Sequence, residues 1–408
     1  AAAGGIASVA ADGSPQLGGD LDLNGNNIDF PTTANISDCL DEDDMASDSA
    51  TMLATQQSIK KYVDDNAGSA KNLLINGCMT FSQRGGVTFD STTNTVNSDD
   101  TVLLDRWILL SDGNDIVDVR KTVDSGGVSG KEDYISLDVE TAQKKFGILQ
   151  VIERDNIKSI TGGTASLSFE AKVSNATRLS DIRAVVVAWD GGADAVTSDI
   201  ISAWGAEGSN PTLVANWTAE NTAANLSVTT SWARYTIENI SIDTSGVWNV
   251  GVFIYQNNVA TNDTVTDTVD ITNIQLEAGA TATSFEYRSK GEELALCQRY
   301  YAKTYNDETV PATATAVGAP HFGDNNTNNA IHQMFIRWHF PVQMRVTPTA
   351  VFYDVNSGTA GQWTESSGGG DVAVTVNQAG QNVLSAWMNT PSQADSRVRG
   401  HITVDAEL

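Results

Sequence analysis

The feature that most limits the fold is a series of short segments in which apolar and polar residues alternate. They lie between residues 72 and 287, are rich in β-branched and aromatic residues, and are separated by Gly, Asn, Asp and Ser. Successive strand side chains point to opposite faces, so this alternation predicts half-buried strands. Their close spacing predicts an antiparallel β-sandwich over residues 71–288. The segments are "YISLDVE", "ASLSFEAKV", "IRAVVVAW", "ARYTIENISI", "VWNVGVFIYQ" and "VDITNIQLEAG".

Residues 289–408 predict a second all-β unit. Ser289 followed by Glu292 forms a capping box, which predicts a short helix at its start. Its apolar side would hold Leu294, Cys297 and Tyr301. The run "NAIHQMFIRWHFPVQMRVTPTAVFYD" predicts a strand, a break at Pro and a second strand. The stretch "NSGTAGQWTESSGGGD" has almost no core-forming residues, so we expect a loop there.

The stretch "LDEDDMASDSATMLATQQSIKKYVDD", residues 40–65, predicts a helix. Acidic residues stand at its start and lysines in its last turns, which suits the helix dipole. One narrow apolar seam runs along it, formed by Met45, Met52, Ile59 and Val63, with Leu53 and Tyr62 beside them. A lone helix with a single seam is marginal in water. The seam therefore predicts packing, either on the domain downstream or on further copies of the same helix.

Residues 1–35 contain too few apolar groups to form a core. We expect this arm to be a linker or a strand that joins a neighbouring chain. The opening "AAAGGIASVA" has no basic flank, so we expect no secretory signal peptide there.

The net charge of the chain limits the classes of partner that it can be expected to bind. It has 51 acidic and 24 basic residues, a net charge of −27. A nucleic-acid partner is disfavoured, because binding to phosphates requires Lys and Arg. No run of 18 apolar residues occurs, so we expect no membrane span. Cys39, Cys78 and Cys297 form no CxxC pair and are expected to be buried free thiols.

Catalytic motifs give little support to an enzyme. Glycan hydrolysis needs two carboxylates at a fixed separation, whereas the acidic runs "DEDD" and "ERD" are typical of a solvated helix start or strand end. The chain has no G-x-S-x-G, P-loop or GxGxxG motif. The histidines show no metal-binding spacing; they are His321, His332, His339 and His401.

Sugar binding without catalysis needs an exposed aromatic face with polar groups around it. Trp363 is the leading candidate, because it stands in the predicted loop of Gly, Thr, Ser and Glu. Four further candidates border polar stretches: Tyr353, His321, Phe322 and Asp324. Trp338 and Trp387 are set apart from this group, since Trp338 continues the apolar face of its strand. We expect the remaining tryptophans of the sandwich to be core residues, namely Trp107, Trp189 and Trp217.

Co-linear segments along the chain resemble tail fibre proteins of tailed bacteriophages. These segments are "SPQLGGDLDLNGNNI", the predicted helix, "NLLINGCMTFSQRG" with "LDRW", "IQLEAGATATSFEYRSKGEELALCQRYY", and "FPVQMRVTPTAVFY" with "VDAEL". The resemblance implies a virion-attachment arm at 1–35, a trimerising helix at 36–70, a carbohydrate-binding-module-like jelly roll at 71–288 and a receptor-binding tip at 289–408. It implies no enzyme activity.

The resemblance also implies partners and a location. The chain would form an elongated homotrimer in the virion tail, assembled in the host cytoplasm. The arm would bind a tail or baseplate protein, and the tip a host-surface glycan. Jelly rolls of this type often hold a structural calcium ion, for which Asn76 and Asp270 are loose matches. The alternatives are a head-decorating or baseplate fibre, and a bacterial carbohydrate-binding or adhesin protein.

Overall fold

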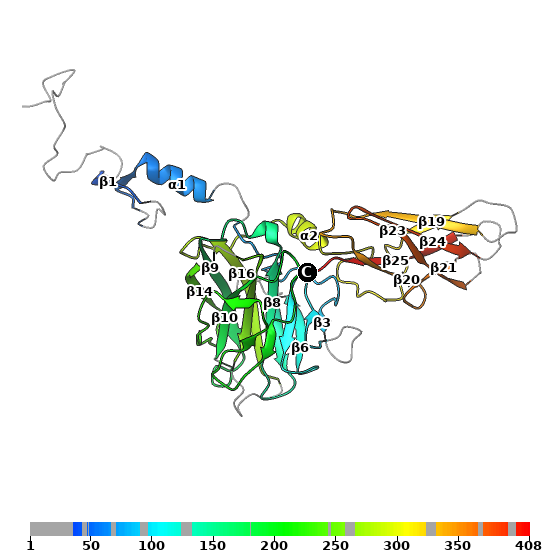
Figure 1. The fold of residues 1–408 in the computed structure, drawn as a ribbon, viewed down its shortest axis with the longest axis horizontal. Helices are drawn as coiled ribbons and strands as arrows, with labels where there is room; N and C mark the ends of the chain where they lie inside the picture. The colour runs from blue at the N-terminus through cyan, green and yellow to red at the C-terminus, as the bar shows by residue number, and fades with distance from the viewer. Residues whose placement is uncertain are drawn as a thin grey trace, which may run out of the picture. The chain divides into compact units, whose positions relative to one another are not determined.

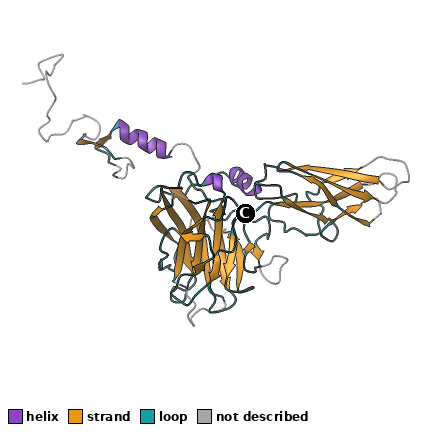
Figure 2. Ribbon diagram, viewed as in Figure 1, coloured by secondary structure: helices purple, strands orange, loops and turns teal. Residues whose placement is uncertain are grey.

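The structure is a computed structural model in which strands dominate (Figure 2), so the predicted all-β class is confirmed. Two compact units divide the chain, Ala1–Ala70 and Lys71–Leu408. No helix among the described residues is long and apolar enough to cross a membrane. The described residues are 36–42, 47, 49–66, 71–89, 97–123, 133–179, 181–243, 246–257, 266–323, 332–365, 370–390 and 397–408.

The first unit contains a shorter helix than the sequence predicts. Strands β1 (Asp38–Leu40) and β2 (Met52–Ala54) pair in parallel, and helix α1 (Gln56–Asn66) follows. The expectation of one helix over residues 40–65 is therefore wrong in its first part. The predicted arm at 1–35 lies outside the described residues.

Hydroxyl and carboxylate side chains explain where α1 begins. The backbone N–H of Ser58 donates to Oγ1 of Thr55 at 3.0 Å, which caps the helix. The Ser58 hydroxyl donates to the Asp41 carboxylate at 3.0 Å and accepts from the backbone N–H of Glu42 at 2.9 Å. Short polar side chains that bond to nearby backbone compete with helix formation. The described residues before Thr55 therefore adopt extended and turn conformations.

The predicted seam does not lie on one helix. Met52 belongs to β2 and Ile59 to α1, and both are exposed, by 40% and 49%. Leu53 and Tyr62 are exposed as well. Met45 lies outside the described residues, and Val63 is described only in its backbone. Met45, Met52 and Ile59 are spaced seven residues apart, which indicated one side of a helix. The prediction is wrong because Met52 lies in a strand.

Two six-stranded antiparallel sheets form the sandwich (Figure 1). The six segments predicted from alternation each lie in one of its strands, which confirms the antiparallel sandwich. The first sheet has the order β14 (Ala233–Ser241), β9 (Thr164–Val173), β16 (Thr268–Ala278), β7 (Asp133–Val139), β6 (Val117–Val123), β3 (Thr88–Phe89). The second has the order β13 (Trp217–Ala219), β10 (Ile182–Trp189), β15 (Asn249–Gln256), β8 (Phe146–Ile152), β5 (Ile108–Ser111), β4 (Thr101–Val102).

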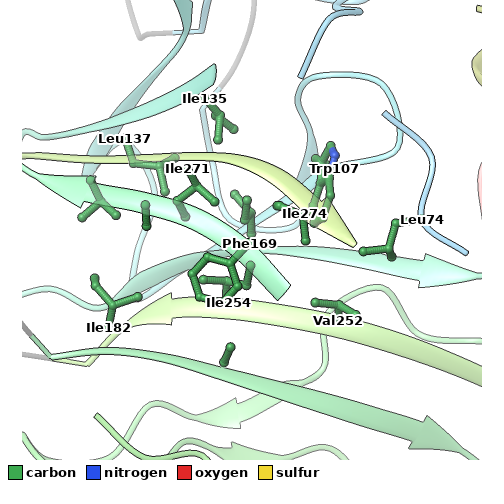
Figure 3. Packing of buried hydrophobic residues seen from close by; sticks show 14 of the residues in the cluster. Leu74, Trp107, Ile135, Leu137, Phe169, Ile182, Val252, Ile254, Ile271 and Ile274 are labelled. Carbon is green, nitrogen blue, oxygen red and sulfur yellow. The ribbon is translucent and has the colours of Figure 1, made fainter. Parts of the chain in front are cut away.

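The main core lies between these two sheets (Figure 3). Phe169 of β9 and Ile254 of β15 are both fully buried there, as is Trp107. The Trp107 indole N–H donates to the backbone oxygen of Asn76 at 3.0 Å, so the ring is buried with its polar atom satisfied. Each fully buried large apolar side chain contributes roughly 1.5–3 kcal/mol relative to an exposed one.

The second sheet is covered on its outer face as well. A segment that includes β11 (Ile201–Ala203) and β12 (Thr212–Leu213) packs its apolar residues on Val185, Val187 and Phe253. Every residue of β8 and β15 is buried. Burial on both faces explains why these strands read as nearly continuous apolar runs. The expectation that Trp107, Trp189 and Trp217 are core residues is confirmed, because none is more than 5% exposed.

The C-terminal β region, residues 289–408, begins with α2 (Lys290–Gln298). The N-cap of this helix is confirmed at Ser289, whose side chain accepts from the N–H of Glu292 at 3.3 Å. Strand β25 (Arg397–Asp405) is central in the larger sheet. Its partners are β17 (Tyr301–Lys303) and β18 (His321–Gly323) on one edge, and β20 (Thr349–Asp354) and β21 (Gln362–Glu365) on the other, with β22 (Gly370–Ala373) beyond β21.

A smaller antiparallel sheet completes the C-terminal β region. Its order is β19 (His332–His339), β24 (Val383–Thr390), β23 (Thr375–Ala379). The three strands lie toward the end of the region away from α2 (Figure 1). Met334 and Ile336 of β19 point into the core shared by the two sheets, and Trp338 packs against it as expected.

The chain's last residues join the C-terminal β region to the sandwich. Arg84 pairs with Asp405 at 2.8 Å and Glu407 at 3.3 Å, and Arg106 also pairs with Glu407. Asp105 is buried beside Arg84, and burial raises its pKa to about 6 although the guanidinium opposes that rise. Buried charges are stable only when paired, so the junction depends on all of these groups.

The three cysteines are free thiols. Cys297 is buried in a small cluster with Phe81 and Tyr300, and burial raises the pKa of its thiol well above the usual value. Cys78 is half-buried. Cys39 is exposed on β1, so the expectation that it is buried is wrong. In β1 every residue is at least half-exposed, because a two-stranded ladder has no layer packed on it.

Candidate functional site

Trp363 is a core residue of β21, which corrects our expectation of an exposed loop. Its side chain is fully buried, and its indole N–H donates to the backbone oxygen of His401 at 3.1 Å. Gly400 makes room for the ring, since a Cβ there would lie 2.0 Å from Cδ1 of Trp363. A sugar cannot stack on this ring in the folded protein.

The other predicted binding residues do not converge on one site. His321 is exposed on β18, whereas Phe322 beside it is half-buried and stacks on Trp363 with 5.9 Å between ring centroids. Tyr353 lies on β20, at the opposite edge of β25. Asp324 lies outside the described residues.

Tyr353 does line a groove of about 620 Å³ beside the junction. Arg84, Thr349, Asp405 and Glu407 also line it. The charged groups in this groove are already paired with one another, Arg84 with both carboxylates. A ligand would have to break those pairs, so the groove is the weaker candidate.

The structure gives no support to a calcium site shared by Asn76 and Asp270. The Asn76 amide donates to the backbone oxygens of Phe81 and Asp105 at 2.9 and 3.1 Å and accepts from the Phe81 N–H. Asp270 accepts from the Ser136 hydroxyl at 2.6 Å and pairs with Lys172. Each side chain is engaged by its own partners, and these positions do not form a common ligand set.

A separate group of carboxylates, Asp115, Asp118 and Glu140, lies within mutual reach of a cation. Asp118 already pairs with Arg120 at 3.6 Å and lies within hydrogen-bonding distance of the Asn97 amide. An acidic group whose buried member is already engaged is typical of a solvated strand end, and it identifies no metal site.

A pocket of about 340 Å³ lies on the outer face of the sandwich's second sheet. Val185, Phe253 and Tyr255 form its floor, and Ile201 and Leu213 of the covering segment form a wall. The Phe253 and Tyr255 rings stack with centroids 4.8 Å apart and planes 12° from parallel. An apolar cavity of this size with a few polar groups is typical of a small-ligand site.

Polar side chains line the rest of the pocket, and they are Asn210, Glu220, Asn221 and Thr222. The Asn221 amide is fixed, because it accepts from the Val186 N–H at 2.8 Å and donates to the Ala184 oxygen at 3.2 Å. Asn210 accepts from the Tyr255 hydroxyl at 2.8 Å. Asn210 and Thr222 are exposed, so they remain accessible to a ligand.

A buried lysine holds the covering segment over this face. Lys145 is fully buried, and its Nζ lies within 3.0 Å of the backbone oxygens of Trp204, Ala206 and Ser209 and 2.8 Å from Oδ1 of Asn257. Burial lowers its pKa. The four oxygens are the compensation that allows an ammonium to be buried. The segment that ends at Asn210 is thereby pinned beside the pocket.

Glu220 is the only carboxylate among the residues that line the described pocket. It accepts from the Asp243 N–H at 3.1 Å and from the Thr218 hydroxyl at 3.2 Å. Burial raises its pKa above the ordinary value. Glycosidases of the common type need two carboxyl groups across the cleft. Among the described residues, the lining of this pocket therefore holds one carboxylate rather than two.

Sequence reasoning did not single out these pocket residues. Phe253 and Tyr255 alternate in the run "VGVFIYQ", but every residue of that strand is buried. Alternation therefore could not tell which face carries a cavity. In the polar lining, Asn210 comes from the covering segment, and Glu220, Asn221 and Thr222 follow β13, more than 30 residues before both rings in sequence.

Comparisons with known proteins give distant structural likenesses alone. No family model matches the chain, and no curated protein matches it. The enzymatically active domain of tailspike protein 4 of bacteriophage CBA120 aligns with 14% identity and a TM-score of 0.31 over 56% of this chain and 25% of that one. The CBM22-1 xylan-binding domain of Xyn10C from Paenibacillus barcinonensis aligns with 13% identity and a TM-score of 0.28.

That second alignment covers 53% of this chain and all of the xylan-binding domain. The family 22 carbohydrate-binding module of Xyn10B from Clostridium thermocellum aligns with 10% identity and a TM-score of 0.26, over 48% of this chain and 99% of the module. Likenesses at such TM-scores carry no argument about function. The candidate site therefore rests on its own geometry.

Proposed function

We propose that this protein is a non-catalytic attachment fibre of a tailed bacteriophage that binds a glycan on the host-cell surface. The pocket on the outer face of the sandwich carries the proposal. Its lining is largely apolar, and the exposed side chains of Asn210 and Thr222 offer hydrogen bonds to hydroxyl groups. The co-linear fibre-like segments of the sequence support the tail role.

The composition of the pocket lining supports binding without cleavage. Glu220 is the one carboxylate among the described lining residues, and its oxygens already accept from the Asp243 N–H and the Thr218 hydroxyl. A single engaged acid cannot supply both the proton donor and the base or nucleophile. The proposed role is therefore adhesion.

Assembly into a homotrimer is part of the proposal. Four large apolar side chains of the first unit are between 40% and 51% exposed, and they are Met52, Leu53, Ile59 and Tyr62. A two-stranded ladder and one short helix bury too little to be stable alone. Packing of three such units would bury these side chains.

The assembly is tested by Met52→Asp combined with Ile59→Asp. Charges placed in an apolar contact between copies cannot be solvated there, so the trimer should dissociate toward monomer in analytical ultracentrifugation. Gln57→Asp is the control, since Gln57 is an exposed polar residue of the same helix. A trimer that persists in the double variant would show that other parts of the chain hold the copies together.

Glycan binding is tested by Ala219→Phe. Ala219 lines the pocket and is exposed, so a phenyl group there would fill the cavity without removing a hydrogen bond. Ala215→Phe is the matched control, because Ala215 is exposed nearby but does not line the pocket. Calorimetric titration with cellohexaose, xylohexaose and chitohexaose would measure binding.

We expect at least one of these saccharides to bind the wild type and the control, and Ala219→Phe to weaken its binding about tenfold or more. Unchanged binding by Ala219→Phe would show that the saccharide does not bind in the pocket. No binding by any of the three would count against the neutral-glycan function.

A further inference from the structure

The outer face of the smaller sheet in the C-terminal β region carries an exposed aromatic row. Phe335 of β19 pairs across the ladder with Trp387 of β24, and Trp387 pairs with Thr375 of β23. Phe335 is 61% exposed and Trp387 is half-buried. Directly opposed residues of neighbouring strands lie on the same face, so these three form one continuous row.

Polar side chains flank the aromatic row on both sides. Gln333 pairs with Asn389, and Arg337 pairs with Ser385. All four are exposed or half-exposed. The opposite face of the same strands holds the core residues Met334, Ile336, Leu384, Ala386 and Met388. The core on this sheet therefore forms without the two aromatic rings of the other face, and Phe335 exposes most of its surface to water.

The size of the face argues against a stable contact with another protein. Eight residues at about 3.3 Å each and three strands at about 4.8 Å each give roughly 380 Å². A stable protein interface buries about 800 Å² on each partner. A narrow, flat platform with two rings and hydrogen-bonding groups around them fits a single polysaccharide strand better.

The charge on the face narrows the class of saccharide. Arg337 is the one formally charged residue among the three members of the aromatic row and the four polar residues that flank it, which are Gln333, Asn389, Arg337 and Ser385. Its guanidinium makes no ion pair within the described residues, whereas Arg84, Arg178 and Arg299 are all paired with carboxylates. A guanidinium binds a carboxylate in a bidentate geometry.

We propose that the face of Phe335, Trp387 and Arg337 binds an acidic polysaccharide, with sugar rings stacked on the aromatic side chains and a uronate carboxylate on Arg337. This is a second contact surface, separate from the sandwich pocket. It rests on the proposed function only in sharing carbohydrate as its ligand class.

The test uses the full-length protein and defined hexasaccharides. Calorimetric titrations with polygalacturonate and alginate hexasaccharides would be compared with cellohexaose, which has no carboxylate. The variants are Phe335→Ala with Trp387→Ala, and Arg337→Gln. Val376→Ala is the matched control, because Val376 is an exposed apolar residue of the same sheet that pairs with Ala386 and lies outside the row.

We expect an acidic hexasaccharide to bind the wild type, the double aromatic variant to bind it at least tenfold more weakly, and Arg337→Gln to bind it about five- to tenfold more weakly. Val376→Ala and the pocket variant Ala219→Phe should bind it as the wild type does. Retention by Ala219→Phe separates this surface from the sandwich pocket, so either proposal can fail alone.

Three results would overturn the inference. One is equal binding of the acidic saccharide by the wild type and the double aromatic variant, with circular dichroism confirming that both are folded. Another is failure of both acidic hexasaccharides to bind the wild type. The third is a change of oligomeric state in the double variant, measured by ultracentrifugation, with saccharide binding unchanged; the face would then be an interface between copies.

Discussion

Two sheet faces of this protein, both with aromatic residues, differ in what covers them. The outer face of the sandwich's second sheet lies under the segment with β11 and β12, which leaves a pocket over Phe253 and Tyr255. Within the described part of the chain, no segment covers the outer face of the sheet β19–β24–β23, and Phe335 is 61% exposed on it. A ligand on the first face would be contacted on more than one side, whereas a ligand on the second face would contact the sheet on one side only.

The difference shows that aromatic content alone does not identify a binding surface. Tyr255 is part of a packed layer with its hydroxyl bonded to Asn210, and only 2% of the residue is exposed. Phe335 contributes almost nothing to the core. Burial and hydrogen bonding separate aromatic residues that maintain the fold from those that are available to bind.

The largest expected effect separates an inner aromatic residue from an outer one. Trp363→Ala removes a fully buried ring and leaves its hydrogen bond to His401 unmade, so we expect a loss of about 3–5 kcal/mol in the free energy of unfolding. Phe335→Ala should cost less than about 0.5 kcal/mol, because the ring is mostly in water. Chemical denaturation of both variants measures the difference. Equal losses would remove the distinction between the two faces.

The second prediction concerns the cover over the sandwich face. Lys145→Met leaves the backbone oxygens of Trp204, Ala206 and Ser209 without their donor. We expect a loss of about 2–4 kcal/mol and faster amide hydrogen exchange in residues 201–213. Lys144→Met is the control, because Lys144 makes a half-exposed pair with Asp112. Unchanged exchange in residues 201–213 would mean that apolar packing alone holds the cover.

A smaller effect is expected at the junction between the sandwich and the C-terminal β region. The pKa of Asp105 is raised to about 6 by burial, above the ordinary 3.8. The folded state therefore binds more protons than the unfolded state between these values, so stability from this group falls as pH rises from about 4 to about 6 and stays lower above that. The change should be about 1–3 kcal/mol.

Asp105→Asn should remove that part of the pH dependence, as measured by denaturation at pH 4, 5, 6 and 7. Asp112→Asn is the control, since Asp112 is 40% exposed and pairs with Lys144, whereas Asp105 lies beside Arg84. A fall in stability between pH 4 and pH 6 that is equally large in the wild type and in Asp105→Asn would show that other groups dominate the pH dependence.

The sandwich was predictable because its signal is local. Alternation of apolar and polar residues within one strand is enough to place "ASLSFEAKV" and "IRAVVVAW" in sheets. The cap at Ser289 was predictable for the same reason, since Glu292 is only three residues away. Such features depend on neighbours in sequence.

The wrong predictions concern positions whose structure depends on residues that are distant in sequence. Trp363 is buried because Gly400 leaves space for its ring. The residues next to Trp363 in sequence do not indicate that space. The described residues among 40–54 are not helical because Asp41 bonds to Ser58, 17 positions away, and β1 pairs with β2. The sandwich pocket likewise forms only when the covering segment packs on β10 and β15.

The central claim, that this fibre-like chain holds a glycan on its β-sheet faces, is tested most directly by hydrogen-exchange mass spectrometry with and without a bound saccharide. The hexasaccharide that binds most tightly in the titrations would be used at saturating concentration. The account predicts slower exchange around the sandwich pocket, in residues 201–223, for a neutral saccharide, and in β19 and β24 for an acidic one. Protection confined to the groove at Tyr353, or to the first unit, would contradict it.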